Sequence, residues 1–246
     1  MEYSGQIEPS DVDNQRYSRQ IAIPEIGEKG QAALSKARVL IIGAGGLGSP
    51  AALYLAAAGV GTLGVADDDS VSWSNLNRQI LYDEADIGLP KVAVAVERLR
   101  KLNSNINVIG HCGRVSSPVE AKEIIAGYDI VIDACDNVAT RYLVGEITSE
   151  LNIPYIYGAI EAFSGQISVF NYGKDEQRRR FRDLWPVECD SVADKSIPSI
   201  GVTAGVIGTL QANEAIKIIC GVGNVLCGKL FTIDLLTLDT YNFSIG

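Results

Sequence analysis

Runs of apolar residues alternate with amphipathic segments along the first two thirds of the chain. Residues 38–43 read RVLIIG, which is typical of a strand buried on both faces of a parallel sheet. An alanine- and leucine-rich stretch over 51–58 predicts a helix ending at Gly59, and residues 61–66 predict a second strand. The same patterns predict helices over 91–103, 120–126 and 140–151, and strands over 106–109, 129–133 and 154–159. This alternation predicts an α/β fold with a Rossmann-like, doubly wound, mostly parallel sheet.

The pattern changes after residue 165. The segment 173–198 is polar, charged and without periodicity, which is typical of a functional or flexible loop. Around it, the sequence predicts a strand over 166–172, a helix over 202–219 and a terminal hairpin over 229–234 and 238–243. We therefore expect antiparallel strands to extend the first sheet in the C-terminal third of one domain that spans residues 1–246.

A glycine-rich motif lies between the first predicted strand and the following helix. Residues 43–48 read GAGGLG, which fits the pattern G-x-G-x-x-G through Gly43, Gly45 and Gly48 and adds a fourth glycine, Gly46, at a variable position. Glycines at these positions let the backbone approach a phosphate group, and the start of a helix favours negative charge. The alternative is a tight strand-to-helix turn without a ligand, which the β-α-β context disfavours.

Asp67 ends the second predicted strand, where a carboxylate can accept hydrogen bonds from ribose hydroxyl groups. Asp68 and Asp69 follow directly, so the pattern leaves open which of the three faces a nucleotide. A turn or helix-capping role is the alternative for Asp67. At this point a nicotinamide-dependent dehydrogenase and an ATP-binding enzyme fit the sequence equally well.

The segment that follows favours a triphosphate. Asn75, Arg78 and Gln79 lie within the run DSVSWSNLNRQ, and Lys91 begins the next predicted helix. Two cations and an amide near a phosphate cradle suit ATP, because its charge exceeds that of a dinucleotide. Arginine offers a fork for phosphate oxygens, and lysine a compact charge. A solvated surface charge is the ordinary alternative for either cation alone.

Acidic residues also follow the strand predicted over 129–133. The run DACDN covers 133–137, at the carboxyl end of that strand, where open α/β sheets bind ligands. A carboxylate there can hold Mg²⁺ against phosphate oxygens. Asp136 or Asn137 can instead cap the next helix, and the two roles can coexist on neighbouring residues.

Composition narrows the partners and the compartment. The net charge is −9 and the isoelectric point is near 4.7, so the chain repels phosphate backbones and no nucleic-acid partner is expected. The uncharged run 39–66 is interrupted by seven glycines, which disfavours a membrane span. Residues 1–13 lack the basic and apolar regions of a secretory signal, so we expect a cytoplasmic location.

The cysteines and the histidine limit metal chemistry. The five cysteines are Cys112, Cys135, Cys189, Cys220 and Cys227. They form no CxxC pair that could chelate zinc, and their odd number without a signal argues for reduced thiols. His111 is the only histidine, which excludes a histidine metal cluster and disfavours a His-dependent triad.

Taken in order, these motifs resemble the ThiF/MoeB/HesA family, the bacterial relatives of ubiquitin-activating enzymes. The resemblance rests on RYSRQ at 16–20, GAGGLG at 43–48, the aspartates at 67–69, SNLNRQ at 74–79, Lys91, DACDN at 133–137 and GVIGTLQANEAIK at 205–217. It implies a homodimeric adenylyltransferase that uses ATP and Mg²⁺ to activate a small β-grasp sulfur carrier ending in Gly-Gly. Its parts would be a nucleotide-binding region at about 16–165, a crossover loop at about 173–198, and a helix and hairpin at 199–246.

The resemblance also implies roles for individual residues. The nucleotide-binding set would comprise the four motif glycines with Asp67, Asp69, Asn75, Arg78, Gln79 and Lys91. Within this set, Asp67 would bind ribose, while Asn75 and the two cations would hold the phosphates. Asp136 would anchor Mg²⁺, and Arg19 would reach into the partner subunit's site as an arginine finger. The carrier's own carboxylate is the nucleophile, so positioning and charge neutralisation suffice for catalysis.

Two features depart from the family pattern. Members commonly carry two CxxC pairs for a structural zinc, whereas the first pair aligns here with 180–183, which contains no cysteine. We therefore predict no zinc. Some members also carry a crossover-loop cysteine that forms a persulfide or thioester bond; its position aligns near Asp194 and Lys195. Cys189 is the nearest thiol and a candidate for that role, with an ordinary exposed loop cysteine as the favoured alternative.

The leading hypothesis is adenylation of a carrier's C-terminal glycine for thiamine, molybdopterin or related sulfur transfer. A family relative acting on a tRNA base or a peptide is an alternative, although the acidic charge and the lack of a basic tail disfavour tRNA. A NAD-dependent dehydrogenase is a further alternative, but it would not explain why Arg78, Lys91 and Asp136 occur together. A catalytically silent scaffold is disfavoured by the intact phosphate-binding positions.

Overall fold

The strands that the apolar runs predict lie side by side in a single sheet. The computed structural model describes residues 9–174, 176–187 and 197–246. In these residues eight strands follow the order β3-β2-β1-β4-β5-β6-β7-β8, parallel from β3 to β5 and antiparallel from β5 to β8. The strands are β1 (Arg38–Ile42), β2 (Thr62–Asp67), β3 (Asn107–Cys112), β4 (Ile130–Asp133), β5 (Tyr155–Glu161), β6 (Ser164–Phe170), β7 (Lys229–Asp234) and β8 (Thr240–Ser244). The predicted fold class is confirmed.

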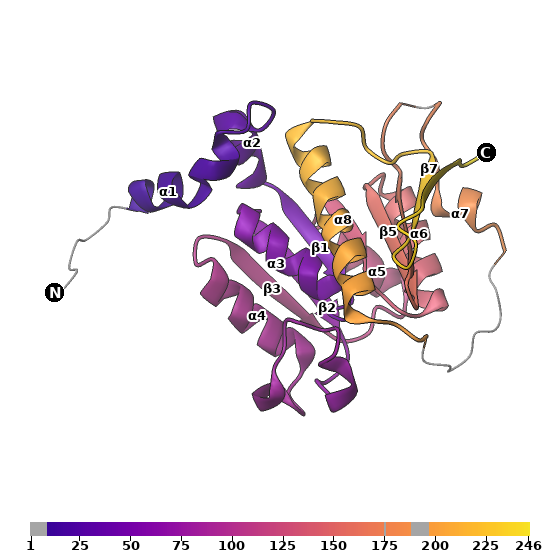
Figure 1. Ribbon diagram of the computed structural model, residues 1–246, viewed down its shortest axis with the longest axis horizontal. Helices are drawn as coiled ribbons and strands as arrows, with labels where there is room; N and C mark the ends of the chain where they lie inside the picture. Colours follow the sequence, from indigo (N-terminus) through magenta and orange to yellow (C-terminus); the bar gives the residue numbers. More distant parts are fainter. Residues whose placement is uncertain (1–8, 175, 188–196) are drawn as a thin grey trace.

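Helices cover both faces of the sheet. In Figure 1, α3, α4 and α8 lie on the near face and α5 and α6 on the far face. The α-helices are α1 (Pro9–Ile21), α2 (Gly27–Leu34), α3 (Gly48–Ala58), α4 (Lys91–Leu102), α5 (Pro118–Ile125), α6 (Val138–Glu150), α7 (Phe181–Leu184) and α8 (Gly201–Cys220). None of the described helices is long and apolar enough to cross a lipid bilayer.

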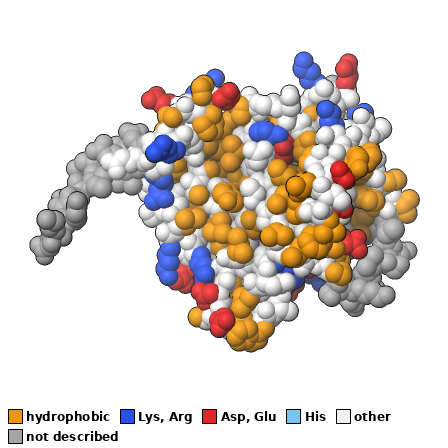
Figure 2. All heavy atoms as spheres, in the orientation of Figure 1, with side chains coloured by type: hydrophobic (Ala, Val, Ile, Leu, Met, Phe, Trp, Pro, Cys, Tyr) orange, Lys and Arg blue, Asp and Glu red, His pale blue; other side chains and the backbone are white. Residues whose placement is uncertain are grey.

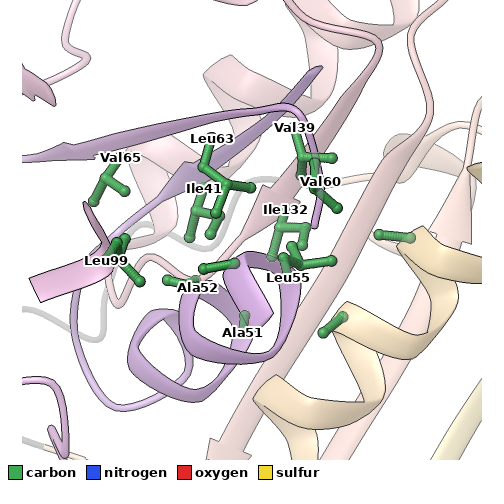
Figure 3. Close-up of a cluster of buried hydrophobic side chains, with 14 of the residues drawn as sticks. Val39, Ile41, Ala51, Ala52, Leu55, Val60, Leu63, Val65, Leu99 and Ile132 are labelled. Carbon is green, nitrogen blue, oxygen red and sulfur yellow. The ribbon is translucent and has the colours of Figure 1, made fainter. Parts of the chain in front are cut away.

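Strand β1 is the centre of the core because successive side chains on a strand point to opposite faces of the sheet. Val39 and Ile41 pack toward α3 and α4, among the side chains drawn in Figure 3. Leu40 and Ile42 pack toward α5 and α6 on the other face. The side chains of Val39, Leu40 and Ile41 are fully buried, which explains why the sequence of this strand is a continuous apolar run.

Several predicted boundaries were wrong. Helix α3 begins at Gly48 rather than at residue 51, and β6 covers 164–170 rather than 166–172. Strand β8 begins at Thr240 rather than 238, because Leu238 has a φ of 64° and lies in the hairpin turn. The segment expected to be a loop contains the short helix α7. The division of the chain into one domain stays a prediction.

Helix α1, which the sequence analysis missed, is fastened to the body by polar contacts. The Tyr17 hydroxyl accepts a hydrogen bond from Asn103 Nδ2 at 2.8 Å, and Arg16 Nη1 donates to the Leu102 carbonyl at 3.0 Å. Gln20 Nε2 donates to the Ala58 carbonyl at 2.9 Å. These partners lie at the C-terminal ends of α3 and α4. The attachment therefore fixes where the neighbouring Arg19 lies.

Helix α8 packs closely against the start of α3, and this contact predicts a difference between two glycines. A Cβ on Gly208 would overlap the Leu47 carbonyl oxygen, whereas a Cβ on Gly205 meets nothing within 4 Å. We expect Gly208→Ala to lower the free energy of unfolding by about 1–3 kcal/mol, because overpacking forces a backbone shift. Gly205→Ala should raise it by roughly 0.5–1 kcal/mol through helix propensity. Chemical denaturation of both variants checks this, and equal effects would contradict the packing argument.

Candidate active site

The candidate site lies where the order of the strands reverses. From β1 the chain adds β2 and β3 on one side, and then returns to place β4 on the other side of β1. Open α/β sheets bind ligands at such a switch point, outside the carboxyl ends of the strands. Gly43 follows β1 and Ala134 follows β4, and these two loops approach so closely that a Cβ on Gly43 would overlap the Ala134 carbonyl. The glycine motif and the DACDN run therefore meet at this edge.

The four motif glycines divide into two structural roles. Gly43 has a φ of 98°, and a Cβ on Gly48 would overlap the Gly43 carbonyl oxygen, so both positions require glycine for the turn itself. Gly45 and Gly46 are partly exposed, and a Cβ there would first meet Gln79, Arg78 and Ala204. The turn interpretation thus accounts for two of the glycines. The other two leave backbone open near the start of α3, as anion binding requires.

Asp67 links the glycine motif to the end of β2. Its Oδ2 accepts a hydrogen bond from the Ala44 amide at 2.7 Å, and its Oδ1 accepts one from the Asp69 amide at 2.9 Å. Burial raises the pKa of Asp67, while the nearby Lys91 ammonium opposes that rise. Because each carboxylate oxygen can accept two hydrogen bonds, both the predicted turn role and further acceptor capacity are present. Asp68 and Asp69 are more exposed than Asp67.

Lys91 is not a solvated surface charge. Its residue is only 4% exposed, and its Nζ lies 2.7 Å from Asp69 Oδ2 and 3.9 Å from Asp67 Oδ1. The start of α4 therefore delivers a cation between the two carboxylates predicted to contact a nucleotide. Lysine presents three donors, so the Asp69 contact leaves donors for another anion.

The SNLNRQ segment brings its side chains against the open glycines. Arg78 Nη1 donates to the Ser74 carbonyl at 2.8 Å, and the Arg78 side chain lies over Gly46. Asn75 Oδ1 accepts from the Ser72 amide at 3.0 Å and so shapes the turn. Gln79 is 4% exposed, and its Oε1 has no hydrogen-bond partner in the described part of the chain. A buried unpaired oxygen of this kind calls for a ligand or a water.

In the loop after β4, the capping role falls to Asn137, and the predicted magnesium role of Asp136 stays a prediction. Asn137 Oδ1 accepts from the Thr140 amide at 2.8 Å, so Asn137 is the N-cap of α6. Asp136 is exposed, and because Asn137 makes the cap hydrogen bond, Asp136 is not the N-cap. Proteins usually hold Mg²⁺ with one or two carboxylates together with substrate phosphates, and a lone Asp136 beside a phosphate cradle fits that donor set.

One predicted residue, Arg19, lies away from this site in its own chain. Arg19 is exposed on α1, which is fastened at the C-terminal end of α3, whereas the glycine motif precedes the N-terminal end of α3. The 11 residues of α3 separate these ends by about 16 Å. Cys189 lies outside the described residues.

Sequence reasoning missed a polar network under the site. Asp133, quoted only as part of a motif, is 1% exposed, and Arg141 Nε donates to its Oδ2 at 2.8 Å. Tyr155 and Gln211 also contact Asp133. Gln211, a polar residue among the apolar positions of α8, was a signal that the sequence offered.

Comparison with known proteins identifies relatives. The ThiF family model matches residues 17–246. The chain is 45% identical to an adenylyltransferase and sulfurtransferase MOCS3-2 from Zea mays over 90% of this chain and 46% of that one. It is 42% identical to a sulfur carrier protein adenylyltransferase from Thermus thermophilus, over 90% of this chain and 83% of that one. The chain thus spans about half the length of the MOCS3 relatives and most of the Thermus relative.

Solved structures share the fold. An Escherichia coli MccB structure with ATP has a TM-score of 0.80 at 22% identity, covering 98% of this chain and 80% of that chain. A PaaA structure has a TM-score of 0.81 at 23% identity, covering 100% and 78%. At this identity the likeness extends to the fold alone, and it agrees with the sheet described above.

The division of roles between Asp136 and Asn137 leads to a matched pair of variants. We expect Asn137→Ala to lower the free energy of unfolding by about 1 kcal/mol, because the Thr140 amide loses its cap. Asp136→Ala, at an exposed carboxylate, should change it by less than about 0.5 kcal/mol. Urea denaturation measures both. A larger loss for Asp136→Ala than for Asn137→Ala would show that the cap has been assigned to the wrong residue.

Proposed function

The chain belongs to the ThiF family, and on that premise we propose that it adenylates the C-terminal glycine carboxylate of a ubiquitin-like sulfur-carrier protein and releases pyrophosphate. The observation that carries this proposal is the meeting, at one switch point, of open glycine backbone, Arg78, Gln79, Lys91 and an uncommitted Asp136. The name of the Thermus relative, which aligns with this chain over most of its length, supports the same reaction.

The proposed chemistry needs no nucleophile from this protein. One oxygen of the carrier's carboxylate forms a bond to the α-phosphorus of ATP, the bond from that phosphorus to the bridging oxygen breaks, and pyrophosphate leaves. The protein's task is to align these groups and to neutralise the charge on the phosphate oxygens. The backbone amides near Gly45, the guanidinium of Arg78 and the ammonium of Lys91 serve that task.

Asp67 and Asp136 would hold the rest of the substrate. Asp67 retains acceptor capacity for the ribose hydroxyl groups beside its two backbone partners. Asp136 would hold Mg²⁺, which when bound supplies positive charge to the phosphate oxygens. The carrier would be a small β-grasp protein ending in Gly-Gly, active in thiamine, molybdopterin or related sulfur transfer.

A homodimer would complete the site, with Arg19 of each subunit serving the other. The attachment of α1 at the far end of α3 supports this arrangement, because it keeps Arg19 away from the site of its own chain. Hydrophobic side chains gather over α8 in Figure 2, and Val202 of that helix is 59% exposed. Such a patch favours burial against another surface.

Nucleotide choice tests the proposal against a dehydrogenase. We expect calorimetry to show ATP binding that depends on Mg²⁺, together with negligible NAD binding, because Arg78 and Lys91 suit a triphosphate. Arg78→Ala should weaken ATP binding at least 10-fold, in line with about 1.5–3 kcal/mol for a hydrogen bond to a charged group. Tight NAD binding without any response to ATP would overturn adenylation.

Mixing two inactive proteins tests the placement of Arg19. Removing a trans arginine finger costs roughly 10³–10⁵ in rate in well-studied phosphoryl transfer, and we expect a smaller loss here because Arg78 and Lys91 share the charge. A dimer of one Arg19→Ala chain and one Asp136→Ala chain has one site with both lesions and one with neither. Carrier-dependent exchange of pyrophosphate into ATP should therefore return on mixing. If subunit exchange is verified and activity stays absent, Arg19 does not act in trans.

A further inference from the structure

The side chain of Arg141, which is only 16% exposed, touches both β4 and β5 behind the candidate Mg²⁺ ligand. Its Nε donates to Asp133 Oδ2 at 2.8 Å, and Tyr155 Oη donates to the same oxygen at 2.7 Å. Its Nη2 donates to the Cys135 carbonyl at 2.7 Å and to the Gly158 carbonyl at 3.2 Å. One guanidinium thus joins the end of β4, the loop after β4, and β5.

These contacts matter because β4 and β5 separate early. Their ladder consists of the pairs Val131↔Tyr155 and Ile132↔Ile156. Beyond it, Gln211 Nε2 from α8 bridges the Asp133 carbonyl at 2.6 Å and the Ile156 carbonyl at 3.1 Å. The Nη2 of Arg141 makes the equivalent bridge two residues further along, between the carbonyls of Cys135 and Gly158. The side chains of Gln211 and Arg141 therefore connect β4 and β5 beyond the point where their backbones stop pairing.

Asp136 lies between two residues that this network and the helix cap hold in place. On one side, the Cys135 amide donates to Asp133 Oδ1 at 3.1 Å and the Cys135 carbonyl accepts from Arg141. On the other side, Asn137 is fixed as the N-cap of α6. The backbone is thus anchored immediately before and after the exposed carboxylate.

A contribution to stability is a weak explanation for this arrangement. A buried ion pair adds little net stability relative to apolar side chains of similar volume, because both charges lose their hydration. What the guanidinium offers here is geometry, since its planar fork satisfies one carboxylate and two carbonyls at once. An apolar side chain or a lysine cannot hold all three.

We propose that Arg141 is a positioning residue, which fixes the 134–137 loop and thereby sets the affinity of the nucleotide-bound site for its divalent cation. Arg141 touches neither the nucleotide nor the cation in this account, and acts through Cys135 and Asp133. The proposal rests on the proposed function for the identity of the ligand, but the fixing of the loop does not.

The test is Arg141→Lys, with Arg182→Lys as the matched control. Lysine keeps a positive charge beside Asp133 but cannot span the Cys135 and Gly158 carbonyls as well. Arg182 forms the corresponding contacts at the surface, with its Nε 2.5 Å from Glu146 Oε1 and its guanidinium 4.6 Å from the ring centre of Tyr142. The same substitution there removes an arginine from an ion pair and an aromatic ring, but its carboxylate partner is Glu146 rather than Asp133.

Two measurements are made on the full chain. Calorimetric titration of Mg²⁺ in the presence of a non-hydrolysable ATP analogue should show an affinity about 10-fold weaker or more for Arg141→Lys, the usual cost of losing support behind a ligand. Arg182→Lys should stay within twofold of the unaltered protein. Hydrogen exchange without any ligand should show faster exchange of the amides at 134–137 in Arg141→Lys alone.

The outcomes separate this proposal from the proposed function. If the unaltered protein binds the analogue without any Mg²⁺ dependence, the proposed function fails, and hydrogen exchange alone decides whether Arg141 fixes the loop. If Mg²⁺ affinity and loop exchange are the same in both lysine variants, Arg141 is not a positioning residue. Should Arg141→Lys fail to fold, Arg141→Gln replaces the fork with a shorter neutral amide that cannot reach the Asp133 carboxylate and both carbonyls at once. It should weaken Mg²⁺ binding several-fold, and an unchanged affinity would overturn the proposal.

Discussion

The rest of the structure depends on the close approach of two loops at the carboxyl ends of β1 and β4. Both faces of β1 are filled by side chains and both edges by neighbouring strands, so only its end is accessible. Gly43 lets the β1 loop meet the backbone at Ala134 where any side chain would collide. The crevice between these loops then collects groups from β2, α4 and the SNLNRQ segment. A chain with net charge −9 thereby places two cations, Lys91 and Arg78, in the region proposed for the phosphates.

Opposite charges share the crevice in a connected arrangement. Lys91 lies between Asp67 and Asp69, and Asp67 in turn holds the Ala44 amide of the glycine motif. Asp133 and Arg141 form a second ion pair. Through this pair, Arg141 also donates hydrogen bonds to a carbonyl in the loop after β4 and to a carbonyl in β5. The group around Lys91 contacts the region proposed for the nucleotide, and the Arg141–Asp133 pair holds the loop that carries Asp136. The charges that would contact the nucleotide are therefore different from the charges that fix the loop.

What the sequence could predict follows from how each feature is encoded. Strand β1 was predictable because its apolar side chains pack on both faces of the sheet and form one apolar run in the sequence. The glycine motif was predictable because positions that have no room for a side chain lie next to positions that leave the backbone open for a phosphate. Helix α1 was missed because hydrogen bonds from Arg16 and Gln20, rather than an apolar stripe, attach it. The contact between Gln211 and Asp133 joins residues 78 apart, which no local pattern reveals.

We propose above that this site transfers an adenylyl group to a carrier's carboxylate. The most direct measurement is the intact mass of a β-grasp carrier ending in Gly-Gly after incubation with the protein, ATP and Mg²⁺, quenched in acid. The carrier should gain the mass of one adenylyl group, and the same carrier with an amidated C-terminus should gain none. A gain in both carriers, or in neither while ATP is bound, would contradict it.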